Sequence, residues 1–205
     1  MNDCPMKEIS YEDFINNYKS ANYLDTSDKL IKEVTSIIEK VKLSKDDALI
    51  SFSKEFDKTE FISSEEFKFN KKDFKKSYES LDHKTINNLE FLRERIVKFH
   101  SEKSMSGWKT EDSAFNEYGQ IVRPIKRVGL YAPGGTATYP SSILMTAVLA
   151  NIAGVEEILL SFPPSNKEVT DLMLASCHIG GVTEALSIGG AQAIAAMAFG
   201  TESIK

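Results

Sequence analysis

The residues best placed for chemistry follow a short apolar segment in the second half of the chain. Residues 128–142, VGLYAPGGTATYPSS, run from a predicted strand through a Pro-Gly-Gly turn to the start of a helix. Ligands of α/β sheets bind at the carboxyl ends of the strands, and a glycine turn before a helix lets backbone N–H groups approach an anion. Tyr131, at the strand end, could stack on a flat ring or donate a hydrogen bond. The alternative is a plain turn with a core tyrosine, which spacing alone favours because isolated glycine motifs are common.

A second turn repeats this arrangement in residues 188–196, IGGAQAIAA. Gln192 falls in the first turn of the following helix, where its amide can both donate to and accept from a ligand. The alternative is that Gln192 only satisfies free backbone groups at the helix start. Two such turns at one sheet edge favour a shared crevice. Neither turn is a Gly-x-Gly-x-x-Gly fingerprint or a P-loop, so a conventional dinucleotide motif is absent.

The residue types that bind metals are scattered. The histidines His83, His100 and His178 form no cluster, whereas a zinc site needs three or four converging ligands. Cys177 and His178 are neighbours on a predicted helix, so their side chains point about 100° apart. We expect structural or surface roles for all three histidines, no metal site and no catalytic residue. The two cysteines, Cys4 and Cys177, fit a reducing cytoplasm and indicate no disulfide framework.

Two regions of different composition must position the glycine turns. All eleven glycines lie at Gly107 or later, whereas 40 of the 55 charged residues, 19 basic and 21 acidic, lie in residues 1–107. We therefore expect a mainly helical region over residues 1–107 and a turn-rich α/β region over residues 108–205. Apolar spacing predicts helices in the first region over 11–19, 30–41, 46–56, 71–81 and 86–99, with Ser27 as a helix cap and a short strand over 67–69.

The second region alternates strands with helices. Strands are predicted over 127–131, 157–162 and 185–188, and helices over 141–152, 169–178 and 191–199. This alternation is typical of parallel βαβ units. The predicted fold class is therefore α/β, with a helical N-terminal region followed by an incomplete Rossmann-like parallel sheet.

Composition excludes several classes of partner. The net charge of −5 argues against binding to nucleic acid or to an anionic membrane surface. No segment approaches the roughly 20 apolar residues of a membrane span. The first residues lack the basic and apolar regions of a signal peptide, so we expect a cytoplasmic protein.

The two glycine-turn blocks, Gly129–Met145 and Gly189–Ser203, strongly resemble histidinol dehydrogenase. The resemblance covers roughly Ile31 to the end, and it departs from the family by lacking a proline near Leu149. Supporting matches lie at Phe99-His100, Trp108, Gly119-Gln120, Pro124, Ala153-Gly154-Val155 and Pro163-Pro164. Relatives are longer and continue past Lys205.

The resemblance implies oxidation of L-histidinol to L-histidine with NAD at a zinc site. Tyr131 and Gln192 match the tyrosine and glutamine with which the family contacts NAD. The zinc ligands and the Glu-His pair for proton transfer belong to the later half of the family, so the resemblance assigns no metal ligand and no catalytic residue here. We therefore expect no dehydrogenase activity from this chain alone.

Two hypotheses follow. The chain is a shortened histidinol dehydrogenase that keeps part of its NAD site, or it is a non-enzymatic module that binds a partner. The partner in the second case would be a complementing C-terminal chain, and a homodimer would resemble the full-length family. Uncovered sheet edges would favour such pairing.

Overall fold

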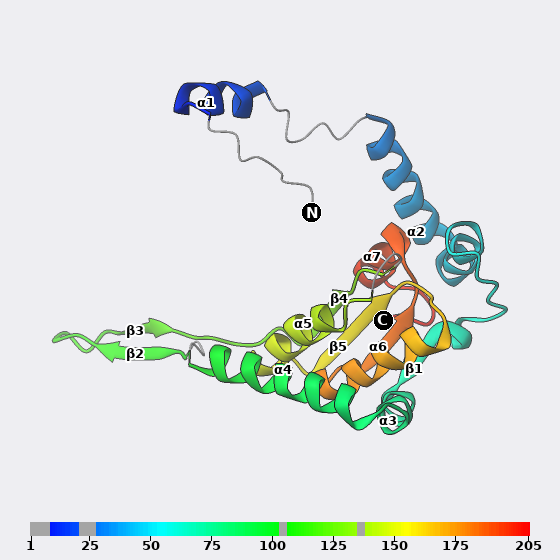
Figure 1. Ribbon diagram of the computed structural model, residues 1–205. Helices are drawn as coiled ribbons and strands as arrows, with labels where there is room; N and C mark the ends of the chain where they lie inside the picture. The colour runs from blue at the N-terminus through cyan, green and yellow to red at the C-terminus, as the bar shows by residue number, and fades with distance from the viewer. Residues whose placement is uncertain (1–8, 21–27, 103–105, 135–137) are drawn as a thin grey trace. The chain divides into compact units, whose positions relative to one another are not determined.

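The computed structural model describes residues 9–20, 28–102, 106–134 and 138–205 (Figure 1). Ser27, Cys4 and Gly135 lie outside the described residues. Contacts divide the chain into two compact units, residues 1–36 and 37–205. In the first unit, helix α1 (Tyr11–Ser20) starts where Ser10 Oγ accepts a 3.0 Å hydrogen bond from the Asp13 N–H. None of the helices in the described part of the chain is long and apolar enough to cross a lipid bilayer.

The charged region forms helices at the predicted places. Helix α2 (Asp28–Phe56) contains non-helical backbone at Lys45, with φ 46° and ψ −119°, so it comprises the two helices predicted there. Helices α3 (Lys71–Ser80) and α4 (His83–Ser101) follow. Between α2 and α3 lie the 3-10 turn η1 (Ser64–Phe67) and strand β1 (Lys68–Asn70). The proposed boundary at residue 107 falls after the end of α4, and this division stays a prediction.

The main sheet contains the three strands predicted in the second region. Strands β4 (Arg127–Tyr131), β5 (Glu157–Phe162) and β6 (Glu184–Ser187) are parallel, in the order β6-β5-β4. The α/β class is therefore confirmed. The sheet is mixed, because β1 pairs antiparallel with β6 at the opposite edge from β4, and the sequence did not predict this pairing.

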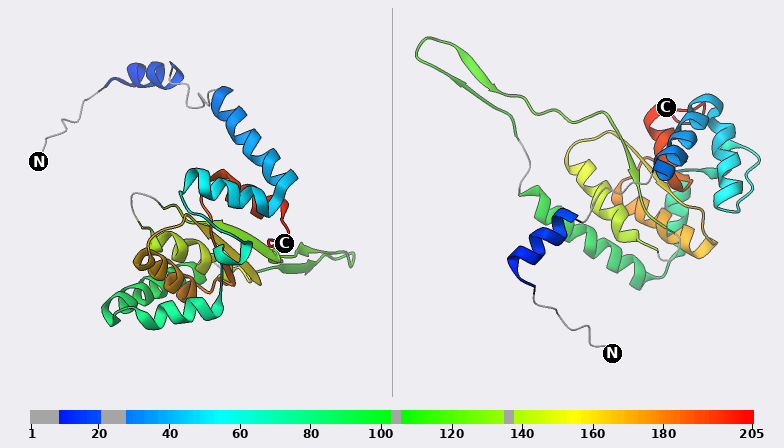
Figure 2. Two further views of the ribbon diagram at one scale, coloured as in Figure 1. Left: turned by 90° about the vertical axis from the view of Figure 1, so that its right-hand side faces the viewer. Right: turned by 90° about the horizontal axis from the view of Figure 1, so that it is seen from above.

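Helices cover both faces of this sheet (Figure 2). Helices α5 (Pro140–Ile152) and α6 (Lys167–Gly180) pack on one face through a core that includes Ile143, Leu160 and Phe162. Helix α7 (Gly190–Phe199) and the second half of α2 pack on the other, around Leu49, Leu159 and Leu186. Successive residues of β5 thus enter opposite cores, as the alternation of side chains along a strand requires. Apolar strands buried on both faces are what the sequence predicts.

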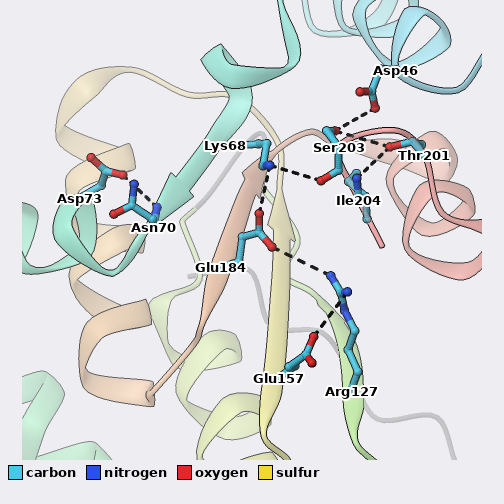
Figure 3. A network of polar contacts seen from close by, with 10 residues as sticks. All are labelled: Asp46, Lys68, Asn70, Asp73, Arg127, Glu157, Glu184, Thr201, Ser203 and Ile204. Carbon is cyan, nitrogen blue, oxygen red and sulfur yellow. Dashed lines mark hydrogen bonds and ion pairs between the residues drawn. The ribbon is translucent and has the colours of Figure 1, made fainter.

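A polar network lies where the parallel strands begin (Figure 3). Arg127 lies 3.5 Å from Glu157 and 4.0 Å from Glu184, and Lys68 lies 3.4 Å from Glu184. Lys68 also donates to the Ser203 carbonyl at 3.3 Å. Arg127, Glu157 and Glu184 lie at the starts of β4, β5 and β6, and Lys68 reaches Glu184 from the antiparallel strand β1, where it pairs with Leu186. The network therefore has a structural role, because it ties these four strands together.

A two-stranded hairpin was not predicted. Strands β2 (Trp108–Glu111) and β3 (Glu117–Gln120) pair antiparallel, and every residue of both strands is exposed. Asp112 closes the turn by accepting hydrogen bonds from the N–H groups of Ala114 and Asn116, at 2.8 and 3.0 Å.

Candidate functional site

The two glycine turns lie at the same edge of the sheet, on either side of Pro163. A Cβ built on Gly134, after β4, would lie 3.2 Å from Pro163. A Cβ built on Gly189, after β6, would lie 3.1 Å from the same proline. Pro163 follows β5, which runs between β4 and β6. The carboxyl ends of three parallel strands therefore form one site, as expected for ligand binding in an α/β sheet.

Tyr131, at the end of β4, is hydrogen-bonded to the glycine turn that follows β6. Its hydroxyl oxygen accepts a 3.0 Å hydrogen bond from the Gly190 N–H. The ring is half-buried against the core formed by α2, α7 and the sheet. This fixed position leaves the hydroxyl hydrogen available to an acceptor on a ligand. The structure thus brings Tyr131 beside the turn that carries Gln192.

Gln192 is the most informative polar residue at this edge. Its side chain is 1% exposed, and neither Oε1 nor Nε2 has a hydrogen-bond partner among the described residues. Gly190 has a φ of +68°, and a Cβ there would lie 2.5 Å from Gln192 Oε1, so only glycine fits over the amide. Buried polar groups in native proteins are nearly always hydrogen-bonded. An orphaned amide beneath a glycine turn is therefore typical of a site that a ligand completes.

Asp57 is a further member of the site that the sequence did not reveal. It follows the last residue of α2, and Lys58 (φ 57°) turns the chain there. A Cβ built on Gly189 would lie 3.4 Å from Asp57 Oδ1, and Oδ2 is buried with no partner among the described residues. Burial raises the pKa of the Asp57 carboxyl above its usual range, against the lowering effect of hydrogen bonding from the Gly189 backbone. No glycine or strand pattern surrounds Asp57, so only the fold could reveal it.

A cavity of about 240 Å³ adjoins the first turn. Pro133 and Gly134 line one side, and Pro163 and Pro164 line the other. Phe162, Val169 and Met173 contribute apolar walls, with Thr138, Ser165 and Asn166 as polar lining. Apolar walls with a few polar groups are usual in pockets for small molecules and cofactors.

The described residues do not fit a zinc ion. No group of three or more His, Cys, Asp or Glu side chains converges anywhere in residues 9–20, 28–102, 106–134 and 138–205. His178 packs its ring against Tyr78, with 4.9 Å between centroids, and His100 packs against Phe99. Cys177 is fully buried, and burial raises the pKa of its thiol. These contacts indicate packing roles for the three side chains.

Comparison with known proteins identifies the family. A family model described as histidinol dehydrogenase matches residues 21–205. The histidinol dehydrogenase of Acinetobacter baylyi is 39% identical over 86% of this chain and 41% of its own length. That of Staphylococcus epidermidis is 39% identical over 96% of this chain and 46% of its own length.

The fold agrees with this family. The crystal structure of histidinol dehydrogenase from Elizabethkingia anophelis superposes with a TM-score of 0.76 at 26% identity, over 98% of this chain and 42% of that chain. The chain thus spans less than half the length of the relatives that it matches. The sequence, the fold and the two glycine turns together show that the chain belongs to the histidinol dehydrogenase family.

Proposed function

We propose that this chain forms the NAD-facing part of an enzyme that oxidises L-histidinol to L-histidine in histidine biosynthesis. The observation that carries the proposal is the buried amide of Gln192 beneath Gly190, which has no hydrogen-bond partner among the residues that the structure describes. Tyr131 lies against the same turn, through its hydrogen bond to Gly190. These two residues match the family's NAD contacts, and the family membership supplies the substrate class.

Each residue has a distinct task in this proposal. NAD, when bound, supplies the acceptor for the hydride that leaves the alcohol. Gln192 offers one acceptor and two donors to a planar amide or a ring edge. Tyr131 offers its hydroxyl hydrogen and the face of its ring. Because the described residues do not fit zinc, we assign no step to a metal here. We place the protein in the cytoplasm, where the free, buried Cys177 thiol would remain reduced.

Calorimetric titration of the full chain with NAD tests the proposal. We expect saturable binding that Gln192→Met abolishes. We also expect no NADH formation with histidinol and zinc, because the described residues hold no cluster of metal ligands. A wild-type chain that does not bind NAD would refute the cofactor role. Turnover comparable to that of a full-length relative would refute the assignment of the chemistry to residues outside this chain.

A second candidate function is that of a partner-binding module. Strand β4 is the last strand of the sheet, so its outer edge has no strand partner among the described residues. An open strand edge presents unpaired N–H and C=O groups that can pair with another chain. The occupant that we favour is a segment equivalent to the remaining length of the relatives, and a second copy of this chain is the alternative.

A further inference from the structure

The β6–α7 turn differs from phosphate-binding turns in one respect. Gly189 is the N-cap residue before α7 and offers no side-chain cap, which would ordinarily leave free N–H groups at the helix start for a ligand phosphate. Here the carboxylate of Asp57 already faces this turn, with hydrogen bonding from the Gly189 backbone. A phosphate in the same place would meet a like charge. The turn therefore suits an uncharged part of a ligand that carries hydrogen-bond donors.

The Gln192 amide and the Asp57 carboxylate, the two buried polar groups at this turn, require different hydrogen-bonding partners. The donor and the acceptor of the Gln192 amide have no partner in the described part of the chain, so Gln192 complements a planar carboxamide. Asp57 Oδ2 likewise has no partner there and, when ionised, only accepts. In a dinucleotide the donors that remain after the carboxamide pairs with Gln192 are the ribose hydroxyls and the adenine amino group, and the hydroxyls of the nicotinamide ribose lie nearest to the carboxamide. A charge-assisted bond to a hydroxyl would satisfy Oδ2.

We infer that Asp57 is a ligand-contacting residue of this site, and that its Oδ2 accepts a hydrogen bond from a ribose hydroxyl of the bound dinucleotide. This inference rests on the proposed NAD function. It adds a carboxylate from the end of α2 to a site otherwise built from the ends of β4 and β6. The residue after β5, where many dinucleotide folds carry the acid for the ribose, is Pro163 here.

Asp57→Asn is the decisive variant, because asparagine keeps the size and one acceptor oxygen for the Gly189 N–H. The probes are NAD and its analogues that lack one ribose hydroxyl, titrated into the full chain. We expect Asp57→Asn to weaken NAD binding about tenfold or more, as for loss of a hydrogen bond to a charged group. The analogue without the contacted hydroxyl should bind wild type and variant equally. Asp47→Asn, an exposed position on the same helix, is the matched control and should bind all probes like wild type.

The possible results distinguish a wrong role for Asp57 from a wrong NAD function. If NAD binds wild type but not Gln192→Met, and Asp57→Asn binds NAD as wild type does, the role of Asp57 is wrong and the NAD function stands. If Asp57→Asn weakens the binding of every analogue by the same factor, the carboxylate only shapes the turn and makes no contact with ribose. If wild type binds no NAD, both the function and the role of Asp57 are refuted. The backbone amide resonances of α7 beyond its first turn should stay near their wild-type positions in Asp57→Asn, which confirms an intact helix after the turn.

Discussion

At the scale of single residues, the buried amide of Gln192 should lower the stability of the folded chain in the absence of a ligand. A buried polar group without a partner destabilises a fold by about 1–3 kcal/mol, and both amide atoms of Gln192 lack partners among the described residues. Gln192→Met keeps the length and removes these groups. We expect the free energy of unfolding, measured in urea without NAD, to rise by about 1 kcal/mol.

Added NAD should make wild type the more stable of the two chains. A ligand that binds only the folded state stabilises it, so NAD should raise the urea midpoint of wild type and leave Gln192→Met unchanged. Gln120→Met on the exposed strand β3 is the control, because its amide is already solvated. A Gln192→Met chain that is less stable than wild type and still responds to NAD would contradict this account.

Tyr131 should contribute to both folding and ligand binding. Tyr131→Phe keeps the ring in its core and removes the oxygen that accepts from the Gly190 N–H at 3.0 Å. A neutral hydrogen bond contributes about 1 kcal/mol, so we expect a fall of that size in unfolding free energy and a several-fold weaker NAD affinity. Tyr118→Phe on the exposed hairpin should change neither quantity.

The site was only partly predictable from sequence. Tyr131 and Gln192 were found because each lies beside paired glycines at the end of an apolar strand, a local pattern. Asp57 lies between helices in a charged stretch, where an acid normally faces solvent. Its position against Gly189 depends on the packing of α2 against the sheet and α7. Asp57 and Gly189 lie more than 130 residues apart in the sequence. No local pattern encodes such a contact.

At the scale of elements, the start of helix α3 depends on a capping box. The Asn70 side chain accepts from the Lys72 N–H at 2.8 Å, and the Asp73 carboxylate accepts from the Asn70 N–H at 2.9 Å. Asn70→Ala should lower the unfolding free energy by about 1 kcal/mol, the usual effect of losing such a cap. Asn88→Ala, exposed within α4, should be neutral or slightly stabilising because alanine favours helix. Urea unfolding of the two variants measures the difference.

The contact between α3 and α6 should depend on pH through Asp171. Desolvation opposes its charge, but Lys167 at 2.9 Å and Ser77 at 2.9 Å outweigh it and hold the pKa of Asp171 below its usual range. A lowered pKa in the folded state stabilises the fold above the ordinary carboxyl pKa, and this stabilisation is lost as pH falls through the folded value. The stability difference between wild type and Asp171→Asn should therefore be constant near neutrality and shrink below about pH 4. Glu156→Gln, at an exposed position, is the control and should show no such dependence.

Elements with a buried face were predictable, and those without one were not. Strands β4 and β5 were predicted with their observed bounds, because apolar runs between glycine and proline mark strands covered on both faces. The hairpin of β2 and β3 buries no residue, so its sequence shows no alternation of apolar and polar positions. The three residues of β1 indicate a strand but not its antiparallel partner β6, which lies over a hundred residues later.

At the scale of the whole molecule, the outer edge of β4 is the place where a larger assembly would continue the sheet. The Ala132 N–H donates to the Ser161 carbonyl of β5 at 2.9 Å. Backbone groups alternate in direction along a strand, so the N–H groups of Val128 and Leu130 also face β5. Those of Gly129 and Tyr131 must then face the outer edge, where a further strand would pair.

Amide hydrogen exchange can test this continuation. We expect a separate chain carrying the remaining length of a relative to slow exchange at Gly129 and Tyr131, because a paired strand removes their amides from solvent. Leu130 is already bonded within the sheet and should change little, which makes it an internal control. Slowed exchange with a second copy of this chain alone would instead favour a homodimer through the same edge. Unchanged exchange at Gly129 and Tyr131 under both conditions, with binding shown independently, would place the interface away from β4 and refute sheet extension as the mode of assembly.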